Sequence, residues 1–330
     1  MVIAINDKFI WDSWYVRDGD VWHGYFLQAP RSIGDPELRH WNVSYGHATS
    51  RDLINWEHLG TTFQPSQGLA WDDFTTWTGS VVRGDDDLWH LYYTGASRAD
   101  DGMYQRIGHA TSEDLHNWSR VGDGQILDLT GPNAAFYEDN MEDSVWHDRA
   151  MRDPWVMRDP DGDGWLMYFT ARARGIAEPN AGGCIGFATS LDGYHWTLQP
   201  PVFTGGYGQL EVPQVFEHKG KWYCLFCTAA EHFSAEQAAR TQGGPVTGNH
   251  YLIASNPRGP WRIAPGFLDG ANPCRRYAAR IVDQEGRLFI LGFADRPDGV
   301  EFVGQVMDPE EVFVGADGHL SFPPQQQAAE

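Results

Sequence analysis

Three acidic residues stand in apolar or aromatic surroundings that are unusual for charged side chains. They are Asp12 in IWDSW, Asp153 in MRDPW and Glu211 in QLEVP. Acidic side chains are rarely buried without partners, and carboxyls that lie close together push their pKa values apart. One carboxyl then stays protonated while another stays ionised, and a pair of this kind can cleave a glycosidic bond. We take the three as candidate catalytic carboxylates, against the simpler alternative that each pairs with an arginine or caps a turn.

An internal repeat would bring these acids together. One unit occurs three times, as GHATSRDLINW (46–56), GHATSEDLHNW (108–118) and GFATSLDGYHW (186–196). A fourth, more divergent copy is LIASNPRGPW (252–261). An aromatic, β-rich run precedes each unit and also occurs as RLFILGFAD near the C-terminus, and a further strand-like element lies before each run across a polar turn. Five such units predict an all-β fold, a single five-bladed β-propeller with four-stranded antiparallel blades.

No linker or break in composition interrupts the chain, so we expect residues 1–330 to form one catalytic domain. The first strand of each propeller blade lines the central channel, and the starts of these strands converge there. The residues in this register are Asp12, Ser80, Asp153, Glu211 and, in the fifth unit, Ala279 and Arg280. The C-terminal EEVFVGADGHLSFP is expected to supply a last strand beside the N-terminal segment. A two-sheet sandwich is the alternative, but it would not need a common register in five units.

The bulk composition narrows the classes of partner. The net charge is −21, so the basic footprint that nucleic acids and anionic membrane surfaces require is missing, and a small neutral carbohydrate is the expected ligand. No apolar run reaches the length of a membrane span, and no signal peptide is evident. We expect a cytoplasmic protein, although the mature form of a secreted one would read the same. The sequence does not indicate an oligomeric state.

Metal ions and cofactors are not expected. Cys224 and Cys227 form a C-x-x-C pair, but no second pair stands at ligand spacing, so buried reduced thiols are the simpler interpretation. Residues 159–164 match the first half of a calcium loop. The twelfth position is Thr170 rather than Glu, which favours a hairpin turn.

Four segments resemble the motifs of one enzyme clan. FIWDSWYV resembles the motif around the nucleophile of levansucrases, and TWTGSV resembles their Trp-Ser-Gly-Ser segment. MRDPWV resembles the Arg-Asp-Pro motif that levansucrases, invertases and fructanases share, and LEVPQVF resembles the segment that carries their acid/base Glu. The four occur in the order of that clan, one in each blade, between residues 9 and 228.

The resemblance implies a retaining glycoside hydrolase or transglycosylase that acts on β-fructofuranosides. It implies Asp12 as the nucleophile that takes the fructosyl group, Glu211 as the general acid and then base, and Asp153 as the transition-state stabiliser. The substrate-binding residues implied are Trp11, Trp77, Thr78 and Arg152. A retaining mechanism places the nucleophile and acid carboxyls about 5–5.5 Å apart. Because the nucleophile must be ionised, we also expect hydrogen bonds to hold the pKa of Asp12 down.

The chain departs from the clan on the leaving-group side. Levansucrases carry a second acid two residues before the acid/base Glu, where this chain has Gln209, and the Arg that follows that Glu is Val212 here. Candidates for the downstream arginine that contacts the leaving group are Arg240, Arg275 and Arg276. The segment 137–149 is expected near the rim, with Trp146 or His147 toward the leaving group, and the loop 230–250, with His232, could overhang the channel.

Two alternatives stay open. An inverting α-L-arabinofuranosidase or β-xylosidase on the same scaffold would also use two Asp and one Glu, with the carboxyls farther apart. A non-catalytic sugar-binding propeller would keep the aromatic residues without needing all three acids. Hydrolysis and transfer cannot be separated by these motifs, because both use the same fructosyl-enzyme. Linkage and substrate length are undetermined as well.

Overall fold

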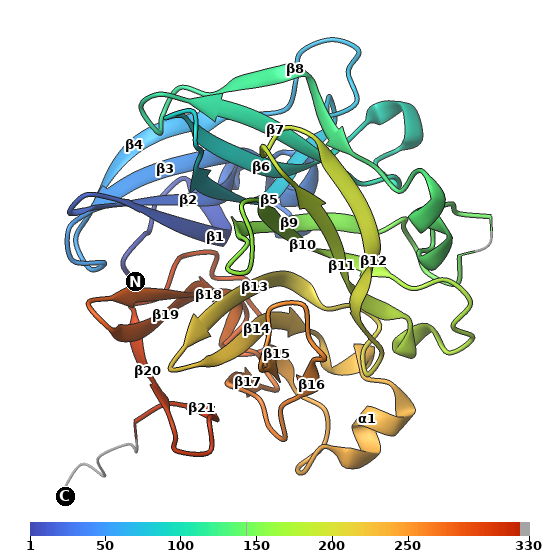
Figure 1. The fold of residues 1–330 in the computed structure, drawn as a ribbon. Coiled ribbons are helices and arrows are strands. Elements are labelled where there is room, and N and C mark those ends of the chain that lie inside the picture. The colour runs from blue at the N-terminus through green and yellow to red at the C-terminus, as the bar shows by residue number, and fades with distance from the viewer. Residues whose placement is uncertain (143, 324–330) are drawn as a thin grey trace, which may run out of the picture.

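The computed structural model of the chain describes residues 1–142 and 144–323. Five antiparallel sheets stand around a common axis, and each is built from strands consecutive in the chain (Figure 1). The first blade is β1 (Lys8–Asp18), β2 (Val21–Pro30), β3 (Ser44–Ser50) and β4 (Trp56–Phe63). The second is β5 (Thr75–Arg83), β6 (Trp89–Ala96), β7 (Arg106–Ser112) and β8 (Ser119–Leu127). The third is β9 (Met151–Arg158), β10 (Trp165–Arg172), β11 (Gly183–Ser190) and β12 (Trp196–Thr204).

The fourth and fifth blades are less regular. The fourth is β13 (Glu211–His218), β14 (Lys221–Thr228), β15 (Thr247–Ala254) and β16 (Arg262–Ile263), with β17 (Asp269–Ala271) also paired to β15. The fifth is β18 (Arg276–Gln284), β19 (Arg287–Ala294), β20 (Glu310–Val314) and β21 (Leu320–Ser321). The innermost strands β1, β5, β9, β13 and β18 contact one another in turn around the axis. The predicted five-bladed propeller is thus confirmed.

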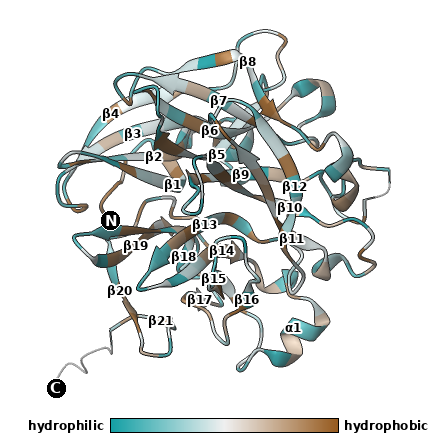
Figure 2. Cartoon of the chain, in the orientation of Figure 1, coloured by the Kyte–Doolittle hydropathy of each residue, from teal (hydrophilic) through white to brown (hydrophobic). Residues whose placement is uncertain are grey.

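Short helices occupy the connections. The α-helix α1 (Ala235–Arg240) lies in the connection between β14 and β15. The 3-10 helices are η1 (Arg31–Ile33), η2 (Pro36–Trp41), η3 (Arg98–Asp100), η4 (Pro132–Phe136), η5 (Pro179–Ala181) and η6 (Ala230–His232). Hydropathy follows this division, with apolar residues on the blade strands and mostly hydrophilic loops between them (Figure 2). None of the helices in the described ranges is both long and apolar enough to cross a membrane.

The repeated Ser-x-Asp of the ATS units builds one turn in each of three blades. In the first blade Ser50 Oγ donates to Asp52 Oδ1 at 3.0 Å, and Asp52 accepts the backbone N–H of Asn55 at 2.7 Å. The indole N–H of Trp56 then donates to the carbonyl of Leu53 at 2.8 Å. These local bonds explain the fixed spacing of serine and tryptophan, because each residue of the turn satisfies a backbone group.

Neighbouring blades are joined by a tyrosine hydrogen bond that recurs around the ring. A tyrosine on the second strand of a blade donates to a carbonyl in the last turn of the next blade. The pairs are Tyr25 to Leu115 at 2.5 Å, Tyr92 to Gly193 at 2.7 Å, Tyr168 to Pro257 at 2.9 Å and Tyr223 to Gly318 at 2.9 Å. Four blades are therefore fastened to their successors by a satisfied buried polar group as well as by packing.

The N-terminal segment helps to close the ring by pairing with Val306, which precedes the predicted C-terminal strand segment. The backbone N–H of Val306 donates to Ile3 at 2.9 Å, and the N–H of Val2 donates back to Val306 at 3.1 Å. Val306 also bridges to Phe293 at the end of β19. The expected C-terminal strand is present as β20 and β21, which form the outer half of the fifth blade.

Each innermost strand has a break in register at its channel end. The breaks fall at Asp12, at Thr78, at Asp153–Pro154, at Val212–Pro213 and at Ala278–Ala279. Such β-bulges add one residue to a strand and re-aim its side chain, and they are frequent beside active sites. The second blade corrects our register: Thr78 occupies the bulge, whereas Ser80 lies farther along β5 and accepts the N–H of Val156. The difference arises because a bulge adds residues to the inner strand, so positions counted back from the second strand do not match between blades.

The predictions of buried free cysteines and of a hairpin turn at residues 159–164 are also confirmed. All four cysteines are free and buried. Residues 159–164 form the turn between β9 and β10, where Asp159 receives both terminal nitrogens of Arg258. Among residues 1–142 and 144–323, no group of three or more His, Cys, Asp or Glu side chains could hold a metal ion.

Candidate active site

The seven residues predicted to be catalytic or to bind the fructosyl unit all line one cavity of about 360 Å³ at the channel end of the propeller. They are Trp11, Asp12, Trp77, Thr78, Arg152, Asp153 and Glu211. Tyr277 and Phe293 of the fifth blade, together with residues of η2 and of the segment before β9, complete the walls. Four bulged strand ends thus deliver acids, a cation and aromatic rings to a single place.

Asp12 has little polar support in the cavity. Thr78 Oγ1 donates to its Oδ2, and within the described residues the side chain forms no ion pair. Burial raises the pKa of Asp12 to about 7, and the nearby carboxylates Asp153 and Glu211 add to this rise. Our expectation that hydrogen bonds hold this pKa down is therefore wrong. One hydrogen bond does not offset the loss of water around a half-buried carboxylate deep in the cavity.

Asp153 is held more tightly than Asp12. Its Oδ2 accepts the hydroxyl of Thr170 at 2.9 Å and the backbone N–H of Val212 at 3.0 Å, and it lies 3.5 Å from Arg152 Nε. Its own N–H donates to Thr94 Oγ1 at 2.8 Å, which fixes a backbone with φ of 59°. Burial raises the pKa of Asp153, and Arg152 works in the opposite direction. The carboxylate is therefore fixed in place by three blades.

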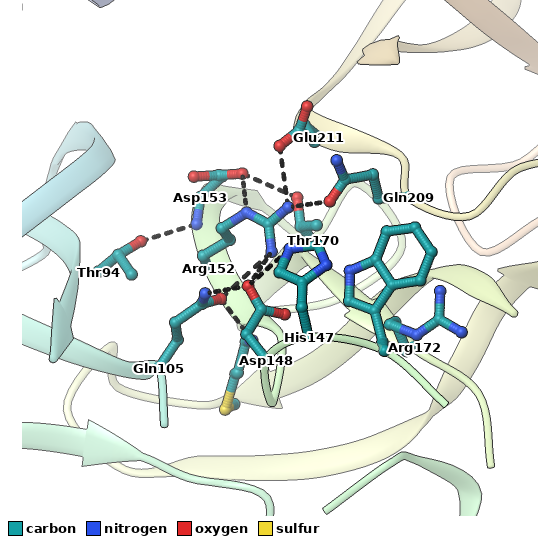
Figure 3. Close-up of polar contacts among 12 residues, drawn as sticks. Thr94, Gln105, His147, Asp148, Arg152, Asp153, Thr170, Arg172, Gln209 and Glu211 are labelled. Atoms are coloured by element: carbon teal, nitrogen blue, oxygen red, sulfur yellow. Dashed lines mark hydrogen bonds and ion pairs between the residues drawn. The ribbon is translucent and has the colours of Figure 1, made fainter. Parts of the chain in front are cut away.

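Arg152 is the centre of the polar network in Figure 3. Its Nη2 donates to Glu211 Oε1 at 2.9 Å and to Gln209 Oε1 at 2.6 Å, while Nη1 donates to Gln105 Oε1 at 3.2 Å. Burial would lower the pKa of Arg152, but the attraction of Glu211, Asp148 and Asp153 raises it above its ordinary value. The side chain therefore carries its charge inside the cavity and links two of the three acids.

Glu211 is held from both sides. Besides Arg152 at Oε1, the hydroxyl of Tyr277 donates to Oε2 at 2.6 Å. Glu211 begins β13, directly before the bulge at Val212, whose φ is 52°. Nothing in the sequence singled out Tyr277, because the fifth unit lacks the family motifs. Its place in the register, two residues before Ala279, was the available signal.

Aromatic rings wall the cavity beside Asp12. Trp11 and His40 meet edge to face with ring centroids 5.8 Å apart, and Trp77 donates its indole N–H to the carbonyl of His40 at 2.9 Å. Burial, together with Arg39 and Arg152, lowers the pKa of His40 to about 3, so the imidazole is neutral. Trp41 is 38% exposed at the edge of the cavity and stacks on Phe74. The sequence did not indicate η2 or these two residues.

The leaving-group side differs from our expectations. None of the three candidate arginines lines the cavity. Arg240 pairs with Glu236 in α1, and Arg275 and Arg276 pair with Asp269 of β17 and Glu310 of β20. Sequence order alone could not separate them from surface and structural arginines. A different arginine, Arg39 within η2, lines the cavity instead of the three candidates.

The predicted rim segment is correct in part. His147 and Asp148 line the cavity, whereas Trp146 packs over the guanidinium of Arg172. His232 lies behind the wall, with Nδ1 3.1 Å from Gln209 Nε2. Gln209 thus links the loop after β14 to Arg152 and replaces the acid that levansucrases carry there.

The arrangement has the parts of a glycosidase centre. One carboxyl, Glu211, is positioned by two donors, while another, Asp12, stands without an ion pair among aromatic rings. A third, Asp153, is fixed by a cation and hydrogen bonds. Such a set can donate a proton, attack an anomeric carbon and hold ring hydroxyls.

Comparisons with known proteins agree with this description. The model of the "Glycosyl hydrolases family 32 N-terminal domain" matches residues 14–301. An extracellular sucrase of Zymomonas mobilis is 25% identical over 366 residues, which cover 97% of this chain and 82% of that protein. A bifunctional fructosyltransferase of Allium cepa is 30% identical over 139 residues, which cover 38% of this chain and 21% of that protein.

Among solved structures, an inulosucrase from Halalkalicoccus jeotgali bound to kestose superimposes with a TM-score of 0.77. The match covers 95% of this chain and 86% of that chain at 22% identity. At this level of identity the likeness concerns the fold alone. The clan to which the motifs pointed is confirmed by the family model, which matches residues 14–301.

Proposed function

The chain belongs to glycosyl hydrolase family 32 and is a glycoside hydrolase or fructosyltransferase, and from that premise we propose a retaining mechanism on β-fructofuranosides. Sucrose and fructo-oligosaccharides are the proposed substrates, in line with the names of the sucrase, inulosucrase and fructosyltransferase relatives. The observation that carries the proposal is the meeting of Asp12, Asp153 and Glu211 from three blades in one cavity. Because each blade supplies part of the site, we propose that the propeller acts as one catalytic domain.

In the first proposed step the carboxylate of Asp12 attacks the anomeric carbon of the fructosyl unit. The bond from that carbon to the glycosidic oxygen breaks, and its electron pair goes to the oxygen, which takes the proton of Glu211. The leaving sugar departs with a new hydroxyl, and the fructosyl group stays bound to Asp12 as an ester. Glu211 is then a carboxylate, a form that Arg152 and Tyr277 are placed to stabilise.

In the second step Glu211 acts as the base. It removes a proton from a water molecule or from a sugar hydroxyl, whose oxygen attacks the same anomeric carbon and releases Asp12. Water gives free fructose, and a sugar hydroxyl gives a transfer product. Both routes regenerate Glu211 in its protonated form and Asp12 as a carboxylate, so the cycle balances.

Asp153 and Arg152 are proposed to hold the fructose ring without bonding to it covalently. Asp153 is fixed by Thr170, Val212 and Arg152, so its remaining acceptor capacity can meet ring hydroxyls. Trp11 and Trp77 offer apolar faces for the ring, and Thr78 positions Asp12. Preorganised groups of this kind stabilise a transition state because they need no rearrangement during the reaction.

The test of the nucleophile is the Asp12→Asn variant, with Asp7→Asn as a control because Asp7 is exposed and away from the cavity. We expect Asp12→Asn to lose turnover of sucrose while its far-UV circular dichroism matches the wild type, and Asp7→Asn to stay active. The anomeric configuration of the first product, read by NMR, should be retained. Inversion would instead support the arabinofuranosidase or xylosidase type, and full activity of Asp12→Asn would contradict the assignment.

A substrate screen settles the remaining choices. Sucrose, inulin-type and levan-type oligomers would be scored for free fructose against transfer products. Tight binding of a fructoside without any turnover would favour the non-catalytic alternative. The cytoplasmic location stays a prediction, and one relative is by name an extracellular sucrase.

A further inference from the structure

Arg280 is a buried cation that the proposed chemistry does not use. It lies on β18 directly after the bulge at Ala278–Ala279, and only 1% of its surface is exposed. Within the described part of the chain, its Nε and Nη2 atoms have no hydrogen-bond partner. A buried, unsatisfied charge is costly, so its presence calls for a compensating interaction.

The remaining nitrogen of Arg280 holds the strand that carries Glu211. Nη1 donates to the carbonyl of Val212 at 3.0 Å and to that of Pro213 at 2.7 Å. The N–H of the same Val212 donates to Asp153 Oδ2. Arg280 and Asp153 therefore bind the backbone of the same residue, Val212, at its C=O and its N–H respectively. The guanidinium of Arg280 also lies over the ring of Trp155, 5.1 Å from the centroid.

The charged neighbours of Arg280 are the two aspartates of the cavity. The titratable groups that interact with it are Asp153, Asp12, Cys227, Cys224 and Tyr15. Burial raises the pKa of both thiols and of the phenol, so these three groups are neutral at working pH. Arg280 itself keeps a pKa of about 10 and stays charged. The anions that remain to balance it are Asp12 and Asp153.

The two aspartates differ in their need for such a cation. Asp153 has Arg152 beside it, whereas Asp12 forms no ion pair among the described residues and has one hydrogen bond, from Thr78. Arg39 also acts on Asp12, but its own contacts are with Pro36, Glu37 and the ring of Phe302. Arg152 is occupied by Glu211 and Gln209. Arg280 therefore acts on both aspartates, of which Asp12 has fewer other polar partners among the described residues.

We propose that Arg280 is a positioning residue that fixes the Val212 bulge beside Glu211 and supplies a buried positive charge to Asp12 and Asp153. It does not touch the substrate cavity, and it acts through Asp12, Asp153 and Val212. The kinetic consequence of this inference rests on the proposed function. The interaction between the charges of Arg280 and the aspartates is a property of the folded protein alone.

The kinetic test compares Arg280→Met and Arg280→Lys through the pH dependence of kcat/KM for sucrose. In Arg280→Met we expect the acid limb to move to higher pH by about one unit or more, because Asp12 then ionises without its cation. Arg280→Lys keeps the charge and should hold the limb near that of the wild type, with a lower kcat because the shorter side chain moves the donor away from the two carbonyls. An unchanged pH profile in Arg280→Met would overturn the proposal.

A double-mutant cycle tests the same coupling without activity. We would measure urea unfolding at pH 8 for the wild type, Asp12→Asn, Arg280→Met and the double variant. If the cation balances Asp12, Arg280→Met should be less destabilising in the Asp12→Asn background, and a poorly folding single variant should be partly rescued. Additive effects would overturn the electrostatic link. If the cycle shows coupling but no variant or wild type turns over a fructoside, the proposed function fails and the pairing stands.

Discussion

The phenolic hydroxyl of Tyr277 and the carboxylate of Glu211 are joined by a 2.6 Å hydrogen bond across the fourth and fifth blades. Arg152 holds the other oxygen of the same carboxylate. A glutamate side chain has several freely rotating bonds, and two donors on opposite oxygens confine it to one orientation. The acid/base candidate is therefore oriented by a residue from the fifth blade, which contributes none of the three candidate carboxylates.

We expect Tyr277→Phe to lower kcat with sucrose by tenfold or more, because a hydrogen bond to a charged group contributes about 1.5–3 kcal/mol. KM should change less, since the phenyl ring still fills its place in the wall. Steady-state kinetics at several pH values would measure this. Tyr251→Phe is the matched control, because its hydroxyl serves Leu320 at the periphery. Equal losses in both variants would mean a general effect on folding.

Asp12 should make the protein less stable as the pH rises through weakly acidic values. Below pH 4 the carboxyl is protonated in both states, so it does not affect stability. Between pH 4 and about 7 the unfolded chain ionises this group, while the folded one retains the proton because its pKa is raised to about 7. Stability therefore falls across this window, by roughly 1.4 kcal/mol for each unit of difference, and stays reduced above it.

Asp12→Asn does not titrate, so its free energy of unfolding relative to the wild type should rise between pH 4 and 7. Urea denaturation at pH 4, 5.5 and 7.5 would measure the difference. The expected result is near equality at pH 4 and a more stable variant at pH 7.5. A constant difference at all three values would show that Asp12 is not buried as an acid.

The tyrosine bonds between blades predict a stability effect without loss of function. Tyr168→Phe removes the donor to the Pro257 carbonyl and leaves a buried acceptor unsatisfied, which should cost about 1–3 kcal/mol. Activity at 25 °C should be nearly unchanged, because this bond lies outside the cavity. Chemical unfolding and sucrose kinetics on the same preparation would check both statements. Tyr194→Phe, at an exposed site, should leave stability within about 0.5 kcal/mol.

Trp41 should affect binding more than chemistry. It lines the cavity at its edge, 38% exposed, and the catalytic candidates do not depend on it for hydrogen bonds. We expect Trp41→Ala to raise KM several-fold with kcat within about twofold, as for the loss of a contact made equally in ground and transition states. Trp41→Phe should restore much of the affinity through stacking on Phe74. A fall in kcat alone would instead place Trp41 in the reaction step.

The sequence sufficed to predict the fold and most of the site, because both depend on local patterns of residues. The Ser-x-Asp turns and the aromatic strands recur at fixed spacing, and each forms from bonds among neighbouring residues, as Ser50, Asp52 and Trp56 illustrate. The register of the repeat then places Asp12, Asp153 and Glu211 at equivalent strand ends. Their convergence follows from closing five such units into a ring.

The tertiary structure alone decided what depends on packing between blades. The bulges that aim Thr78 rather than Ser80, the hydroxyl of Tyr277 and the buried charge of Arg280 arise from contacts between residues far apart in the chain. The pKa of Asp12 is the clearest case, because ring closure removes water from the carboxylate and outweighs its single hydrogen bond. Residue types and spacing identify which groups can react. The protonation and orientation of these groups are set by burial and by residues distant in the chain, and a linear pattern does not contain this information.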